Sequence, residues 1–317
     1  MTGLATRLSA RLTAPVTMGT WRLPSPLLVA LAAIGASLLV IVGATEWRHF
    51  NDEHAYWLAA QRLAAGSPLY DLGAAPNTPF AYWYPPPLAQ VLAPLTSFVA
   101  ADAFSAAWTV LLLACLWWLA GRDLLLALAF VAFLPVAVEL RVRNVHLVLA
   151  VLVVLGLRRS WVFWVPAAAL KITPVLGIAY LAAAGRWRDA LKVGALGLAV
   201  LGASVVLAPD AWRQFIDVVG ARAGTDGGSI LPIAIPFPLR FLAGGMLALL
   251  AGWIAAGRVG GGAVGRWGPQ RAGETLLVVG LTIANPTLWM TAFALLVAIV
   301  PLWRTARPAA ASPAAAR

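Results

Sequence analysis

Long apolar runs separated by short polar segments make up most of this sequence. The clearest runs cover residues 27–45, 104–120, 124–140, 193–208 and 237–257. An α-helix needs about 20 mostly apolar residues to cross the hydrocarbon core of a bilayer. The pattern therefore predicts an all-α integral membrane protein, and counting all apolar segments gives roughly 8–10 transmembrane helices.

The polar segments divide the chain into three parts. Residues 1–22 contain three arginines and no acid, and residues 305–317 are basic and rich in Pro and Ala. Because basic residues beside a span favour the cytoplasm, we predict a cytoplasmic N-terminus (1–22), one transmembrane domain (23–304) and a disordered, basic, cytoplasmic tail (305–317). The first apolar run exceeds the ~7–15 residues of a signal-peptide core and predicts an uncleaved span. Residues 46–87 then form a long extracytoplasmic loop.

Composition excludes several classes of protein. The 317 residues are 62% hydrophobic and only 11% charged, which is typical of a membrane protein. The net charge of +11 comes from arginines in short loops beside the apolar runs, where they meet membrane lipids, so we expect no nucleic-acid partner. The single Cys115 excludes an intrachain disulfide and a thiolate metal cluster.

Candidate chemistry begins in the 46–87 loop. Asp52, Glu53, His54 and Tyr56 lie on a predicted short helix, in which Asp52 and Tyr56 are four residues apart and share a face. Asp52 is the candidate general base, able to accept a proton from an attacking hydroxyl. Alternatively, it only caps the helix. Glu53 points away from Asp52 and is a substitute candidate.

The same loop offers aromatic rings but no defined metal motif. Trp57, Trp83 and Tyr84 could stack on a sugar, although aromatic residues are also common anchors at the membrane surface. His49 and His54 flank the two acids, but their spacing matches no metal-binding pattern. We therefore expect neither a metal nor another cofactor.

A basic segment, RVRNVH, follows the apolar run 124–140 and provides Arg141, Arg143, Asn144 and His146. By the count of spans, it lies on the outer side, where arginines need an anionic partner or reach lipid head groups. Asn144 and His146 could donate hydrogen bonds to a sugar or a phosphate, although a lone histidine here could equally be a packed residue. We expect the segment to lie below the membrane surface in a protein-lined cavity.

Lys171 lies in the middle of the apolar segment 161–184, three residues before Pro174. An ammonium group at this depth is costly and indicates a functional site. Basic residues flank the segment on both sides, which favours two half-helices that enter and return, with Lys171 at the tip. If this tip meets the RVRNVH segment, Arg141, Arg143 and Lys171 could bind a phosphate.

Several short patterns together carry a resemblance to a known family. They are Asp52 and Tyr56 with AAQRLAAG and LYD, then YPPPLAQVLAPL, NVHLVLAVLVVLGL, ALKITPVLGIAYLAAAGRWRDAL and APDAW. In this order they resemble glycosyltransferase family 87, the polyprenyl-phosphate-mannose-dependent α-mannosyltransferases of the GT-C class.

The resemblance implies a GT-C-type bundle, an extracytoplasmic active site and inverting, single-displacement transfer. Asp52 falls on the family's loop aspartate, which is taken as the base, and Lys171 falls on its Lys-x-x-Pro. Asn144 and His146 fall where the family usually has Gln and Asn. The family's C-terminal histidine is missing, because Asn285-Pro286 is followed by Thr287-Leu288-Trp289-Met290-Thr291.

These observations predict a hexosyltransferase that moves a sugar, mannose by resemblance, from a polyprenyl-phosphate donor to a glycolipid or glycan acceptor. Asp52 would be the base, and Arg141, Arg143 and Lys171 would hold the donor phosphate. Glu53, His54, Tyr56, Tyr84, Asn144 and His146 are further substrate-binding candidates. A transporter of lipid-linked sugars would also need basic residues at depth, and a non-catalytic divergent member remains an alternative.

Overall fold

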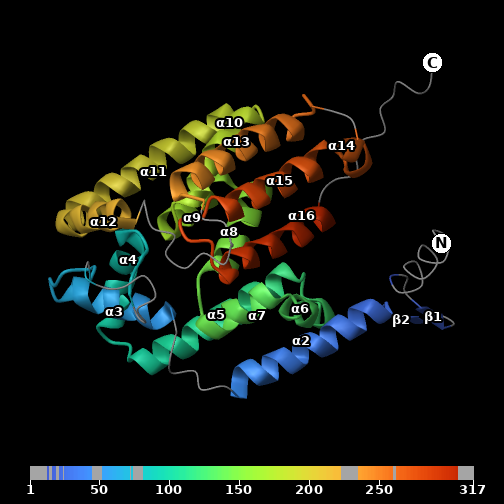
Figure 1. Ribbon diagram of the computed structural model, residues 1–317, viewed down its shortest axis with the longest axis horizontal. Helices are drawn as coiled ribbons and strands as arrows, with labels where there is room; N and C mark the ends of the chain where they lie inside the picture. Colours follow the sequence, from blue (N-terminus) through green and yellow to red (C-terminus); the bar gives the residue numbers. More distant parts are fainter. Residues whose placement is uncertain are drawn as a thin grey trace.

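The computed structural model describes residues 13, 16–18, 21–23, 25–44, 52–71, 73, 81–222, 235–259 and 262–305. This part of the chain is almost entirely helical (Figure 1). A small antiparallel hairpin of β1 (Val16–Met18) and β2 (Trp21–Leu23) precedes the helices. The prediction of an all-α polytopic membrane protein is confirmed in its essentials.

The first half of the chain forms two groups of helices. One group lies beside the N-terminal helix α2, which packs against α6, and the other is the pair α3 and α4 at the opposite end (Figure 1). The elements are α2 (Pro26–Ala44), α3 (Asp52–Ala64), α4 (Pro86–Thr96), α5 (Ala101–Leu119), α6 (Leu124–Val131), α7 (Leu134–Val142) and α8 (His146–Arg158).

The second half packs on the first through α8, which contacts α5, α9 and η3. Its long helices α11, α13 and α15 form the upper layer in Figure 1. The elements are η1 (Trp161–Phe163), α9 (Trp164–Leu170), η2 (Thr173–Val175), α10 (Leu176–Ala183), α11 (Trp187–Leu207), α12 (Pro209–Arg222), α13 (Phe237–Ala255), α14 (Gly262–Trp267), α15 (Pro269–Ile283), η3 (Met290–Ala298) and α16 (Ile299–Thr305).

Among the described residues, four helices are long and apolar enough to cross a membrane: α2, α5, α11 and α13. Counting the bent pair of α6 and α7 as one span gives five, and four further apolar helical segments are shorter. Large apolar side chains point outward from these helices; Val40 is 71% exposed and Val206 is 81% exposed. Such exposure fits a surface that faces lipid rather than water.

The predicted span over residues 124–140 is not one continuous helix. The segment forms two helices, α6 and α7, that meet at an angle of 86°. Phe133 is extended, and Pro135 lies in the first turn of α7. Because proline has no N–H and its ring collides with the preceding turn, the helix cannot continue through it. The bend directs the end of α7 toward α3.

The predicted break at Lys171 is confirmed. Lys171 has extended backbone angles and separates α9 from η2 and α10. Trp164, which is fully buried, fills the space beside the break. A Cβ added at Gly177 would lie 2.4 Å from the indole of Trp164, and one at Gly156 would lie 2.8 Å from it. The two glycines thus allow α8 and α10 to close around one tryptophan and fix the position of Lys171.

The 46–87 loop is partly helical, as predicted. Its short helix is α3, which ends before Gly66. The polar segment after the apolar run 193–208 also starts as a helix, α12, and residues 223–234 lie outside the described part. Residues 306–317 and His49 lie outside it as well.

Candidate functional site

Residues from four distant segments meet at the N-terminal end of α3. They are Asp52 and Glu53 on α3, the connection between α7 and α8, the break at Lys171, and Asn285 after α15. The connection turns sharply because Arg143 adopts a left-handed conformation, with φ of 54°. Trp108 on α5 donates a hydrogen bond to the carbonyl of Arg143 at 3.0 Å, which holds the turn in place.

Asp52 is held by a chain of polar groups. The side-chain amide of Asn144 donates a hydrogen bond to Asp52 Oδ2. Asn144 Oδ1 in turn accepts from the Tyr84 hydroxyl at 2.9 Å, and that hydroxyl accepts from Tyr56 at 3.0 Å. Since Asn144 Oδ1 also accepts from the backbone N–H of Val145 at 2.7 Å, its NH₂ group must face Asp52. Asn144, Tyr56 and Tyr84 therefore lie at one site with Asp52, as the sequence predicted.

Burial raises the pKa of Asp52 to about 7. The hydrogen bond from Asn144 and the positive charge of Lys171 lower this pKa, whereas the charges of Glu139 and Glu53 raise it. Burial also raises the pKa of Tyr56 and Tyr84, so their hydroxyls stay neutral. A carboxyl group with a pKa near neutral pH is well matched to accept a proton from a substrate.

Glu53 belongs to a separate ion pair. Arg143 Nη1 lies 2.6 Å from Glu53 Oε1, and Ser105 donates to the same oxygen at 2.7 Å. Glu53 is 1% exposed and Arg143 is 7% exposed. Burial raises the pKa of Glu53, and the hydrogen bond from Ser105 and the charge of Arg143 lower it. The pair connects α3 to the turn after α7, and Glu53 compensates the charge of Arg143.

A third network surrounds Lys171. Its Nζ lies 2.7 Å from His146 Nε2 and 3.3 Å from Asn285 Oδ1. His146 Nδ1 lies 3.0 Å from Glu139 Oε2. Glu139 Oε1 also accepts the backbone N–H groups of His146 at 2.5 Å and Leu147 at 3.2 Å. An ammonium only donates and a carboxylate only accepts, so the histidine fits between them as a neutral ring with its proton on Nδ1.

One residue, Tyr84, contacts both the Lys171 network and the Asp52 network. Lys171 Nζ lies 5.5 Å from the centre of the Tyr84 ring, while the hydroxyl of the same ring donates to Asn144. Tyr84 therefore contacts the ammonium and belongs to the hydrogen-bond chain of the acid. The two groups that the sequence singled out independently, Asp52 and Lys171, lie in the same part of the molecule.

The three cations predicted to bind the donor phosphate, Arg141, Arg143 and Lys171, do not form one cluster. Arg143 pairs with Glu53, and Arg141 is exposed on the last turn of α7. Of the three cations, Lys171 is the one that contacts Tyr84, a member of the Asp52 network. His54 is half-buried and stacks on Trp57 with ring centres 5.9 Å apart. Trp57 itself donates to the carbonyl of Val99, so its ring serves the packing of α3.

The sequence analysis missed Glu139, Ser105 and Asn285 as members of the site. Glu139 is fully buried and is the only acid within the apolar run 124–140. The argument that singled out Lys171 applies equally to a carboxylate at such a position. Asn285 is fully buried as well, and Arg240 fixes its segment by donating to the carbonyls of Asn285 and Pro286, each at 2.7 Å.

Across the described segments, no group of three or more His, Cys, Asp and Glu side chains could hold a metal ion. His49, which flanks Asp52 and Glu53 in the sequence together with His54, is not among the described residues. The absence of a metal remains a prediction for the chain as a whole.

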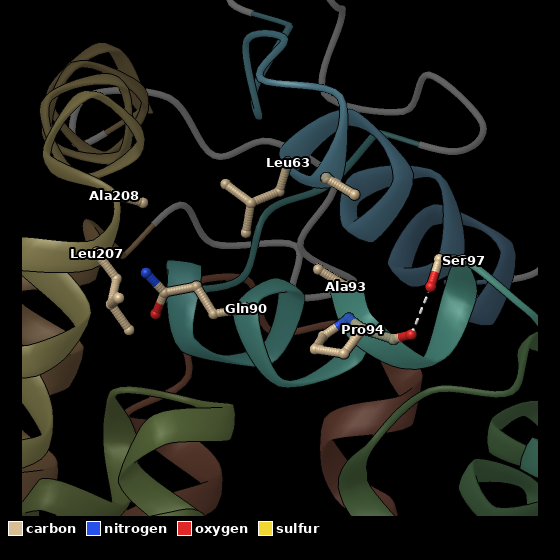
Figure 2. A pocket seen from close by; sticks show the side chains of 8 residues that line it. Leu63, Gln90, Ala93, Pro94, Ser97, Leu207 and Ala208 are labelled. Atoms are coloured by element: carbon tan, nitrogen blue, oxygen red, sulfur yellow. Dashed lines mark hydrogen bonds between the residues drawn. The ribbon is translucent and has the colours of Figure 1, made fainter.

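A groove of about 410 Å³ lies at the far end of α3, between α3, α4 and α11 (Figure 2). Leu63, Ala93 and Leu207 line it together with Gln90. The amide of Gln90 is already bonded to Ser204 in both directions, at 2.8 and 2.5 Å. With its polar groups satisfied, the groove offers apolar contacts that suit a hydrocarbon chain. Eleven residues separate Leu63 from Asp52, or ~16 Å along the helix.

The fold and the site define a polytopic membrane protein in which a half-buried acid, an amide and an ammonium group meet at one end of the helical bundle. The chain belongs to glycosyltransferase family 87, whose family model matches residues 82–316. The resemblance noted from the sequence is thus confirmed, although the match begins after Asp52. Comparisons with curated proteins and with solved structures gave no significant match.

Proposed function

We propose that this family 87 glycosyltransferase takes a sugar, mannose by family resemblance, from a polyprenyl-phosphate donor. The acceptor is a hydroxyl group of a glycolipid or glycan on the extracytoplasmic side of the cell membrane. The observation that carries the proposal is that Tyr84 connects Asp52, a proton acceptor, with Lys171, a half-buried cation: its hydroxyl bonds to Asn144, which bonds to Asp52, and its ring lies against the Lys171 ammonium.

Asp52 acts as the general base. The acceptor oxygen attacks the anomeric carbon and its proton passes to Asp52, while the bond between that carbon and the phosphate oxygen breaks. Attack from the face opposite the leaving group inverts the sugar carbon. A pKa of about 7 leaves a large fraction of Asp52 ionised near neutral pH, and makes the group basic enough to take the proton.

Lys171 stabilises the departing lipid phosphate, which gains one negative charge when the bond to the sugar breaks. A fixed cation aimed at developing charge acts most strongly where water is excluded. His146 and Asn285 hold the ammonium in place. Arg143 does not serve this role in the proposal because Glu53 already compensates it, and Arg141 would assist only from the exposed end of α7.

Tyr84 and Asn144 position Asp52 through their hydrogen bonds. The apolar groove beside α4 and α11 suits the hydrocarbon chain of one of the two lipid substrates. No cofactor takes part in this scheme.

The test supplies purified protein with radiolabelled polyprenyl-phosphate-sugar and membrane glycolipids. Asp52→Asn should reduce transfer about 10²–10⁴-fold. Asp71→Asn is the matched control, because Asp71 is an exposed acid in the same loop and its bond to the Gly73 N–H survives in an asparagine. Glu53→Gln is a poor control, since it breaks a buried ion pair.

Equal activity of Asp52→Asn and the wild-type protein would remove the base from the proposal. Movement of labelled lipid across the bilayer without a new glycosidic bond would instead identify a transporter.

A further inference from the structure

A second cavity, of about 350 Å³, lies at the opposite end of α5 and α8 from Asp52. Helix α8 begins at His146, beside Lys171, and ends at Arg158, which lines the cavity. This separation corresponds to ~18 Å along the helix. Figure 1 shows the C-terminal helix α16 lying close to α5 and α8. The cavity is therefore separate from the site proposed for sugar transfer.

The walls of this cavity are apolar. Trp118 and Leu119 come from α5, and Val154 and Leu155 come from α8. Trp118 is 37% exposed, so one side of the cavity opens to the surroundings of the helices. A tryptophan at the end of a membrane helix usually lies at the level of the lipid head groups. The walls thus suit the upper part of an acyl chain.

Three arginines also line the cavity at its edge: Arg158, Arg159 and Arg304. The first of them already binds other groups of the protein. Arg158 forms a two-pronged ion pair with Glu274 and donates to the carbonyl of Leu302 at 2.8 Å. Gln270 donates to the same carboxylate at 3.1 Å. This pair is neutral overall and fixes α8 to α15 and α16.

The other two arginines, Arg159 and Arg304, are exposed and have no carboxylate partner among the described residues. Arg304 donates from Nη1 to the carbonyl of Ala120 at 2.9 Å, which leaves its other N–H groups for a ligand. Gly121 lies next to this contact, and a Cβ there would lie 2.9 Å from Arg304 Nη1. Its φ of +69° also favours glycine. The guanidinium is therefore held at the rim by the backbone.

We propose that this cavity binds an anionic phospholipid, whose phosphate lies between Arg159 and Arg304 and whose acyl chain enters between α5 and α8. Guanidinium groups match phosphate oxygens in geometry and charge. Basic residues in short loops generally prefer one side of the membrane, and this preference does not require them to border a cavity. Here they border an apolar cavity directly, and this combination fits a lipid better than a free anion.

Native mass spectrometry of the whole protein, released from nanodiscs of phosphatidylglycerol and phosphatidylcholine, tests the proposal. The wild-type protein should retain phosphatidylglycerol selectively. The double variant Arg159→Gln/Arg304→Gln should lose at least about tenfold of this retention. The matched control, Arg188→Gln/Lys192→Gln, removes two exposed cations from α11 and should retain the lipid.

Two further variants complete the test. One distinguishes a lipid site from a site for free phosphate, and the other distinguishes a loss of binding from a loss of folding. Leu155→Trp fills the cavity without changing its charge, and should also reduce lipid retention. Arg159→Lys/Arg304→Lys keeps the charge and should retain part of the binding, which shows that the double glutamine variant fails through charge rather than folding. The proposal is overturned if the glutamine variant retains the lipid as well as the wild-type protein does. It is also overturned if inorganic phosphate displaces the lipid from the wild-type protein and binds Leu155→Trp equally well.

Discussion

Glu139→Gln is the most informative single change outside the proposed base. The glutamine can keep its oxygen toward the backbone N–H groups of His146 and Leu147, but it then presents NH₂ to His146 Nδ1. The imidazole must respond by moving its proton from Nδ1 to Nε2. Nε2 lies 2.7 Å from the ammonium of Lys171, so two donors would face each other.

The magnitude follows from the contacts that are lost. Hydrogen bonds to charged groups contribute about 1.5–3 kcal/mol each. Lys171 would lose the one from Nζ to His146 and would shift toward Asn285, its other partner at 3.3 Å. If Lys171 stabilises the leaving phosphate, misplacing it should reduce kcat by about 10²–10³-fold, as for other groups that stabilise charge in the transition state.

Two measurements check this prediction. The turnover assay should show a loss in kcat larger than any change in KM. The chain has three histidines, so ¹⁵N-histidine spectra can be assigned with a His146→Gln variant, and they should show the proton on Nδ1 in the wild-type protein and on Nε2 in Glu139→Gln. If the tautomer is unchanged and kcat stays within about twofold, Glu139 does not set the position of Lys171 and the reasoning fails.

Three further predictions concern the base, the ion pair and the packing around the Lys171 break. Because burial raises the pKa of Asp52 to about 7 and only the ionised form accepts a proton, kcat/KM should rise as the pH increases from 5 to about 7; a flat profile over this range would count against the prediction. Glu53→Gln should destabilise the protein by about 3–5 kcal/mol, because Arg143 stays buried without its carboxylate. In thermal unfolding, the double variant Glu53→Gln/Arg143→Gln should recover much of the stability that the single variant loses. Gly177→Ala should cost about 1–3 kcal/mol through collision with a buried indole, whereas Gly194→Ala, which has open space, should be nearly neutral in the same assay.

The sequence located much of the site because its residues are unusual for their surroundings. Lys171 stands out in an apolar segment, and Asp52 stands out in the one long polar loop. The break at Lys171 followed from the nearby Pro174 and the flanking basic residues. Local rules of helix formation and membrane burial were sufficient for these features.

The pairing of side chains across the fold could not be predicted in this way. Arg143 lies 90 residues from Glu53, and no local pattern shows that the two form an ion pair. This pairing favours a structural role for Arg143 over the predicted role as a phosphate ligand. The bend between α6 and α7 was not predicted despite Pro135, because an apolar run of suitable length was interpreted simply as one span.

The central claim is that Asp52 and Lys171 serve a single reaction, and a double-mutant cycle on sugar transfer tests it most directly. The rates of Asp52→Asn, Lys171→Met and the double variant are compared with the wild-type rate under single-turnover conditions. Because groups that act as a unit are strongly non-additive, the double variant should be little slower than the slower single variant. Fully additive losses, or a Lys171→Met variant as active as the wild-type protein, would contradict the account.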